Sequence, residues 1–188
     1  VDVRFFPHAE AAMHEAFSIV RDYWRGRGEE RDEIVVFDGI EPGPVCRTRP
    51  LTAGEQITLV SLPWPSCRRC PHEENAASCT APCIESIRRE LDRLEKPPAA
   101  IVVEPLVRFH PALQISPLSL LRKTAIMAEE SGALLIADER NTLYGKSAHR
   151  FASMAGGARP HLMCLQGALS SGMGGIAGLV IDSRCLEA

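Results

Sequence analysis

Apolar and polar positions along the chain follow two different periods. Apolar residues recur with helical spacing in 8–25, 82–95 and 117–132. Short apolar runs rich in β-branched residues separate and follow these segments, at 33–37, 57–60, 100–104, 133–137, 162–165 and 176–181. Strands that are apolar on both faces and alternate with helices are typical of parallel sheets. The pattern therefore predicts an α/β fold, with a mostly parallel sheet that has helices on both faces.

The ends of the helices carry recognisable signals. Pro7 suits the first turn of the first helix. Ser116 is a good N-cap, and Pro117 suits the first position of the helix that ends at Gly132. Outside the predicted strand at 57–60, residues 38–80 are rich in Pro, Gly and Cys, so we expect mostly loop there.

Composition narrows the possible roles. The chain has 188 residues, 45% of them hydrophobic, which is ordinary for one globular domain. A net charge of −3 offers no basic field for nucleic acid or a membrane surface. No apolar run reaches the ~20 residues that span a bilayer, and no signal peptide opens the chain. We therefore expect a cytoplasmic protein. Because the chain starts at Val1 without an initiator Met, we also expect a fragment.

Carboxylates follow two of the predicted strands. Glu104 ends one strand, and Asp138 and Glu139 end the next. Ligands of open α/β sheets bind beyond the carboxyl ends of the strands, so these groups are candidate site residues. Carboxylates at strand ends also serve commonly as caps or solvated groups, and position alone favours that second interpretation.

Six segments in order and spacing resemble the class III (fold-type I) pyridoxal-phosphate aminotransferases. The most specific one carries the paired Asp138 and Glu139 and the glycine turn that follows them. The six segments are 6–11, 36–43, 103–105, 120–132, 136–152 and 160–172. The resemblance implies that residues 1–188 are part of the family's large domain. It also implies that an N-terminal segment and the C-terminal small domain are absent, and that the protein forms a homodimer or a larger assembly.

The resemblance assigns pyridoxal phosphate as the cofactor and Asp138 as the partner of its pyridine nitrogen. It places the lysine of the Schiff base at Gly167, a residue with no side chain for that task. The chain has only three lysines, and none follows Lys146, so a small shift of register does not supply one. The sequence therefore predicts a catalytically silent relative with a structural or partner-binding role. An active aminotransferase, or a fragment of one, with an unusual lysine stays open as an alternative.

Other cofactor positions implied by the resemblance are degenerate. Pro7, His8 and Ala9 stand where small hydroxyl and glycine residues would cradle the phosphate, although His8 retains a possible hydrogen-bond donor. Glu41 replaces the aromatic residue that stacks on the ring, and Pro42 replaces the histidine after it. The glycines expected after Glu104 are replaced by residues 108–111. Glu10, Thr142 and Gly145 match the family, but a purely structural role explains them equally well.

A cysteine-rich insert spans about residues 62–84. Cys67, Cys70, Cys79 and Cys83 form two closely spaced pairs, which is compatible with zinc or an iron–sulfur cluster. The alternative is that these cysteines are free thiols. We expect the side chain of His72 to be solvated rather than a metal ligand. A metal-binding interaction module built on these cysteines is therefore a third possible role.

One departure from the family pattern leads to a structural prediction. Arg140 stands where the family has an apolar residue, two positions after Asp138. A buried carboxylate without a cofactor needs a counter-charge. We therefore predict that Arg140, or another arginine such as Arg108, reaches Asp138 or fills the cofactor volume.

Overall fold

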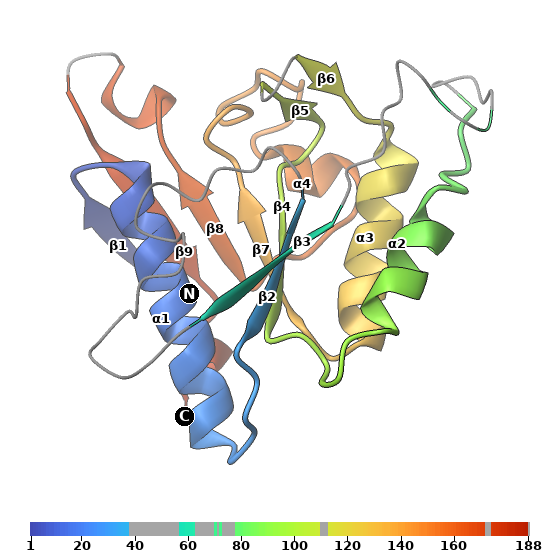
Figure 1. Cartoon of the computed structure of the whole chain (residues 1–188). Helices are drawn as coiled ribbons and strands as arrows, with labels where there is room; N and C mark the ends of the chain where they lie inside the picture. Colours follow the sequence, from blue (N-terminus) through green and yellow to red (C-terminus); the bar gives the residue numbers. More distant parts are fainter. Residues whose placement is uncertain are drawn as a thin grey trace.

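The computed structural model describes residues 1–37, 57–62, 70, 72, 78–109, 113–171 and 174–187. In this part of the chain a seven-stranded sheet has the order β1-β9-β8-β7-β4-β2-β3 (Figure 1). Its strands are β1 (Asp2–Phe6), β2 (Glu33–Phe37), β3 (Thr58–Leu62), β4 (Ala100–Val103), β7 (Leu134–Asp138), β8 (Leu162–Leu165) and β9 (Ala177–Ile181). A separate two-stranded sheet pairs β5 (Val107–Arg108) with β6 (Gln114–Ile115).

The central strands run in one direction. β2, β3, β4, β7 and β8 are joined by parallel ladders, whereas β9 is antiparallel to β8. β1 is in turn antiparallel to β9, so it points the same way as the central strands. The α/β prediction with a mostly parallel sheet is confirmed. One consequence matters for the site: β1, β4, β7 and β8 all end at the same edge of the sheet.

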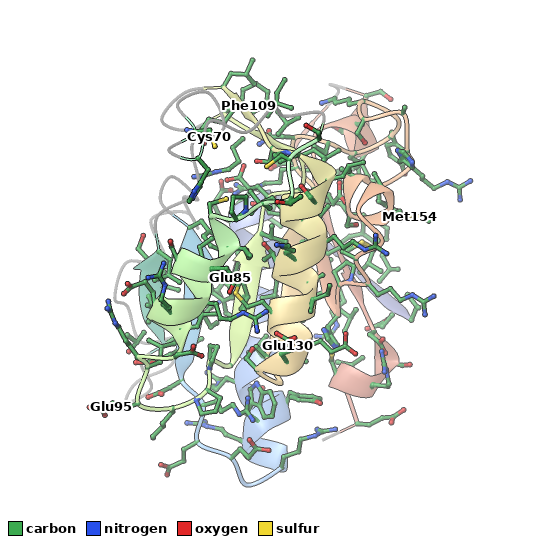
Figure 2. The ribbon with its side chains drawn as sticks, turned by 90° about the vertical axis from the view of Figure 1, so that its right-hand side faces the viewer. Cys70, Glu85, Glu95, Phe109, Glu130 and Met154 are labelled. Carbon is green, nitrogen blue, oxygen red and sulfur yellow. The ribbon has the colours of Figure 1, made fainter. Side chains whose placement is uncertain are left out.

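Helices cover both faces of this sheet. The helices are α1 (Ala9–Gly26), α2 (Ile84–Leu91), α3 (Leu118–Glu130) and the short α4 (Ala152–Ala155), with 3-10 turns η2 (Ala168–Ser170) and η3 (Ser183–Cys185). The chain crosses from β1 to β2 through α1 in one direction along the sheet, and from β4 to β7 through α3 in the other. Right-handed crossovers in opposite directions put the two helices on opposite faces, and α2 packs against α3 (Figures 1 and 2).

The apolar stripe of α1 packs against the sheet. Met13 and Phe17 are almost fully buried, and the Cys164 thiol of β8 lies 3.8 Å from the sulfur of Met13. Near the other end of the helix, the indole N–H of Trp24 donates to the carbonyl of Ala99 at 2.8 Å. Burying a side chain such as Phe17 stabilises the fold by roughly 1.5–3 kcal/mol. These contacts hold α1 over the sheet, and its first residues therefore lie at the carboxyl edge.

Some details of the predicted elements are wrong. Helix α1 starts at Ala9 with His8 as N-cap, so Pro7 lies outside it rather than in its first turn. Helix α3 starts at Leu118 with Pro117 as the cap residue, so Ser116 is not the N-cap. Strand β1 was not expected at all. Within the described residues, no helix is long and apolar enough to cross a membrane.

Candidate functional site

Four segments meet at the carboxyl edge of the sheet. Strand β1 leads into His8, β4 into Glu104, and β8 into Gly167, while Asp138 is the last residue of β7. Because β7 pairs with β4 on one side and β8 on the other, Asp138 lies in the middle of this edge. The fold thus brings together the sequence-predicted positions that the structure describes. Glu41 and Pro42 lie outside the described residues.

Arg140 binds Asp138 directly. The guanidinium donates from Nε to both carboxylate oxygens at 2.9 Å and from Nη2 to Oδ2 at 2.6 Å. The backbone N–H of Arg140 donates to Oδ1 at 3.2 Å. The side chain of Asp138 is 1% exposed and that of Arg140 is 22% exposed. The predicted contact between these two residues is present, and both oxygens of Asp138 are engaged by the chain itself.

The network continues to the first turn of α1. Nη1 of Arg140 lies 3.6 Å from Oε1 of Glu10, whose other oxygen lies 3.2 Å from Nδ1 of His8. Nδ1 of His8 accepts the backbone N–H of Ala11 at 3.2 Å, so this nitrogen is occupied as a helix cap. Ala9, the other degenerate position, is 1% exposed and packs in the core. Burial opposes the charge of Arg140, but its hydrogen bond to Asp138 and the negative charge there raise the pKa of Arg140.

Gly167 lies just after β8 and has a positive φ of +78°. A Cβ atom at this position would lie 3.5 Å from the carbonyl oxygen of Arg140. The loop after β8 therefore touches the loop after β7. Any side chain at position 167 would strain the backbone, because L-residues rarely adopt this conformation.

A second buried pair lies beside Asp138, and the sequence did not reveal it. Nε of Arg108 lies 3.6 Å from Oε1 of Glu104, with side chains 1% and 8% exposed. Asn141 donates to Oε2 of Glu104 at 3.4 Å. Burial, followed by the charge of Asp138, raises the pKa of Glu104 to about 7. Arg108, which the sequence offered as a possible partner of Asp138, thus pairs with Glu104. Four residues separate the two outside any helix, so their spacing gives no local signal of the pair.

Glu139 has a structural role. Its carboxylate is fully buried and accepts the hydroxyl of Thr142 at 2.5 Å and the backbone N–H groups of Ala152 and Ser153 at 3.0 and 2.7 Å. These bonds tie the loop after β7 to the start of α4. Gly145, in the same loop, has φ of +81°, which a glycine adopts without strain. The structural interpretation of Thr142 and Gly145 accounts for both residues.

The described cysteines of the insert are Cys70, Cys79 and Cys83, all free thiols. Burial raises the pKa of the Cys83 thiol, and the nearby charges of Cys79 and Cys70 raise it further. Cys79 Sγ accepts the backbone N–H of Ala81 at 3.2 Å. Cys67 lies outside the described residues, and within them no group of three metal-ligating side chains could hold an ion.

Comparison with known proteins agrees with this architecture. The family model of the class III aminotransferases matches residues 9–184. The chain is 27% identical over 181 residues to the adenosylmethionine-8-amino-7-oxononanoate aminotransferase of Synechococcus elongatus, covering 90% of this chain and 41% of that protein. It is 25% identical over 122 residues to a leucine/methionine racemase of Thermococcus litoralis, covering 64% of this chain and 27% of that protein.

Solved structures show the same fold. The (S)-enantioselective omega-transaminase of Thermomicrobium roseum superposes with a TM-score of 0.83 at 20% identity, covering 98% of this chain and 43% of that one. The fold is thus that of the pyridoxal-phosphate-dependent transaminases. The chain belongs to the class III aminotransferase family, and it spans less than half the length of the relatives it matches.

The family implies pyridoxal phosphate, but the residues present do not fit it. Arg140 donates to both oxygens of Asp138 and so already supplies the cation that a protonated pyridine nitrogen would supply. Position 167 offers no amine, and the backbone there has a positive φ that side chains rarely allow. The side chain of His8 caps its own helix through Nδ1. Asp138 and Nδ1 of His8 are thus engaged within the chain, and position 167 lacks the amine.

Proposed function

We propose that this chain is a catalytically silent, class III aminotransferase-like unit that serves assembly or partner contact rather than amino-group transfer. The observation that carries this proposal is Gly167 at the position the resemblance assigns to the Schiff-base lysine. The contact of Arg140 with Asp138 supports it, because a cation of the chain meets the carboxylate that would otherwise meet the cofactor. We place this assembly in the cytoplasm, as a homodimer or a larger oligomer.

The distribution of retained residues supports a scaffold role. Core strands and glycine turns keep the family pattern, and Glu139 serves the packing of its own loop. The polar positions that would contact a cofactor have changed or have acquired partners within the chain. Relaxed selection on catalysis, with continued selection on folding, accounts for both observations.

Reaction with pyridoxal phosphate tests the proposal. We expect no visible absorption band that borohydride reduction traps on a single lysine, either in the wild type or in Gly167→Lys. The Gly167→Lys variant fails because its backbone is strained and because Arg140 still binds Asp138. Ser170→Lys, in the same loop, is the control for adventitious reaction at a surface amine. A reduced adduct on one native lysine, such as Lys146, would instead support the alternative of an active aminotransferase.

A metal-binding module is the second candidate function. The observation that favours it is the sequence spacing of Cys67, Cys70, Cys79 and Cys83, which form two close pairs. These four thiolates are the proposed ligands. Elemental analysis after anaerobic purification should find zinc or iron, and a Cys67→Ser, Cys70→Ser variant should lose it. The absence of both metals from the wild type would eliminate this candidate.

A further inference from the structure

The β5–β6 hairpin lies beyond the carboxyl end of β4, at the edge of the sheet where the candidate site is (Figure 1). Its ladder pairs Val107 with Ile115 and Arg108 with Gln114. Among the described strands, none of the seven-stranded sheet pairs with the hairpin. Two-stranded hairpins are marginally stable by themselves in water. The contacts that the hairpin makes with the end of β4 therefore decide whether it stays in place.

The turn that leads into the hairpin is strained at Leu106. Its φ is +62°, a conformation that residues with a side chain rarely adopt. The N–H of Val107 donates to the carbonyl of Pro105 at 2.7 Å, and the N–H of Ser116 donates to the carbonyl of Leu106 itself at 2.8 Å. Backbone strain of this kind persists only where the surrounding contacts hold it. Leu106 can therefore act as a hinge, since the chain relaxes there when those contacts are lost.

A buried ion pair joins the hairpin to the end of β4. Nε of Arg108 lies 3.6 Å from Oε1 of Glu104. The groups that face Glu104 from the end of β7 and the loop after it are Asp138, Arg140 and Asn141. Asp138 has its cation at 2.6 Å, so its negative charge is well compensated. Glu104 meets its own cation at a longer distance, and it is therefore the carboxyl group of the two that takes up a proton more readily.

A proton on Glu104 favours the closed hairpin. Burial, followed by the charge of Asp138, raises the pKa of this carboxyl group to about 7 in the folded protein. Opening at Leu106 would bring Glu104 into water, where a glutamate ordinarily has a pKa of about 4.3. A group whose pKa is higher in the closed state stabilises that state while it is protonated. The stabilisation is lost as pH rises through about 7, when the buried group becomes charged.

We propose that Glu104 is a proton-operated latch for the β5–β6 hairpin, which is held closed while Glu104 is neutral and opens more often at Leu106 once Glu104 is ionised. Arg108 and Arg140 favour the ionised form, but burial and the charge of Asp138 outweigh them. Opening exposes the end of β4 and admits water beside Asp138, at the centre of the carboxyl edge. This device goes beyond the silent role proposed above, and it operates whether or not a cofactor binds.

Hydrogen exchange at two pH values tests the latch. Mass spectrometry of the wild-type chain, without pyridoxal phosphate, would give the protection of the hairpin amides and of the β7 amides, each corrected for the intrinsic exchange rate at that pH. Between about pH 6 and about pH 8 the protection of the hairpin should fall about tenfold, as expected for a pKa of about 7 in the closed state and about 4.3 in the open state. Because the hairpin opens locally, it should be less protected than β7 at both pH values.

Three variants separate the titration from the hinge. Glu104→Gln is neutral at every pH, so the protection of its hairpin should differ by less than about twofold between the two pH values. Leu106→Gly relieves the strain of the turn without a change of charge, so it should alter protection by the same factor at both pH values. Glu95→Gln is the matched control, at an exposed site at the opposite end of the molecule from Phe109 beside β5 (Figure 2), and it should behave like the wild type.

The wild-type chain alone can overturn the proposal. Equal protection of the hairpin at both pH values would do so, and so would equal protection of the hairpin and β7, which would show that the hairpin opens only when the whole fold opens. A pH dependence that persists in Glu104→Gln would also overturn it, because another group would then be responsible. All of these measurements are made without cofactor, so none of them decides whether the chain is catalytically silent.

Discussion

Asp138→Asn removes the charge at the centre of the carboxyl-edge network while keeping the shape of the side chain. Arg140 would then keep its positive charge beside a neutral amide, with a carboxylate oxygen of Glu10 3.6 Å from its Nη1 atom. Breaking a fully buried ion pair costs roughly 3–5 kcal/mol. Because the Arg140 side chain is 22% exposed, water can recover part of that cost. We therefore expect Asp138→Asn to lower the free energy of unfolding by about 2–3 kcal/mol.

The companion variant separates pairing from packing. Asp138→Asn combined with Arg140→Leu removes both charges. The double variant should therefore lose less free energy of unfolding than the two single variants lose when their losses are added. We expect a coupling of roughly 1–3 kcal/mol in urea denaturation. A built-in comparison exists at Asp182 and Arg184, which have the same spacing and a contact of 2.6 Å at a much more exposed site. Asp182→Asn should be clearly milder. Additive effects at positions 138 and 140, or equal losses at both sites, would refute this reasoning.

Three further predictions concern buried groups. The pKa of Glu104 in the folded protein is raised to about 7, so its contribution to stability should decline as pH rises from about 5 to 8. The decline should reach up to about 3 kcal/mol. Glu104→Gln should flatten this pH dependence of the free energy of unfolding in urea titrations. Glu139→Gln should lower the free energy of unfolding by about 2–3 kcal/mol, because the buried carboxylate of Glu139 accepts hydrogen bonds from three donors. A loss below about 0.5 kcal/mol would contradict the structural role of Glu139. Burial raises the pKa of Cys164, so a thiol reagent should label it only after unfolding; labelling of the native protein would show that the core opens there.

Much of the fold could be predicted because its signals are local. Unbroken apolar runs identified the central strands, including β4 and β7, and the helical stripe identified α1. Strand β1 was missed although Val1, Asp2, Val3, Arg4 and Phe5 alternate in polarity, because five residues at the start of a chain give a weak signal. Strand β9 is antiparallel to β8, its neighbour in sequence, and it also pairs with β1, a partner far away in the sequence. No local pattern could reveal the pairing of β9 with β1.

The candidate site also contains features that the sequence could predict and features that it could not. The contact of Arg140 with Asp138 could be predicted because the two residues are close in sequence and a buried carboxylate needs a counter-charge. The pairing of Arg108 with Glu104 could not, since it depends on the tight turn at Leu106, which has a φ of +62°. For Glu139 the sequence favoured a cap or a solvated group over a ligand contact, and its carboxylate does accept backbone N–H groups at the start of α4. Its donors Ala152 and Ser153 could not be predicted, because they are backbone groups more than ten residues away. The order of side chains in the sequence does not indicate which backbone N–H groups will act as donors.

Binding of pyridoxamine phosphate tests the central claim most directly, since this form of the cofactor carries no aldehyde and cannot react with surface lysines. Equilibrium dialysis would measure how much pyridoxamine phosphate the wild-type chain retains. The phosphate group and the ring of this ligand are then the only sources of affinity. With Asp138 held by Arg140 and His8 capping its own helix, we expect no saturable binding. Saturable retention of one molecule per chain, lost in Asp138→Ala, would contradict the claim that the protein's own side chains have taken over the cofactor site.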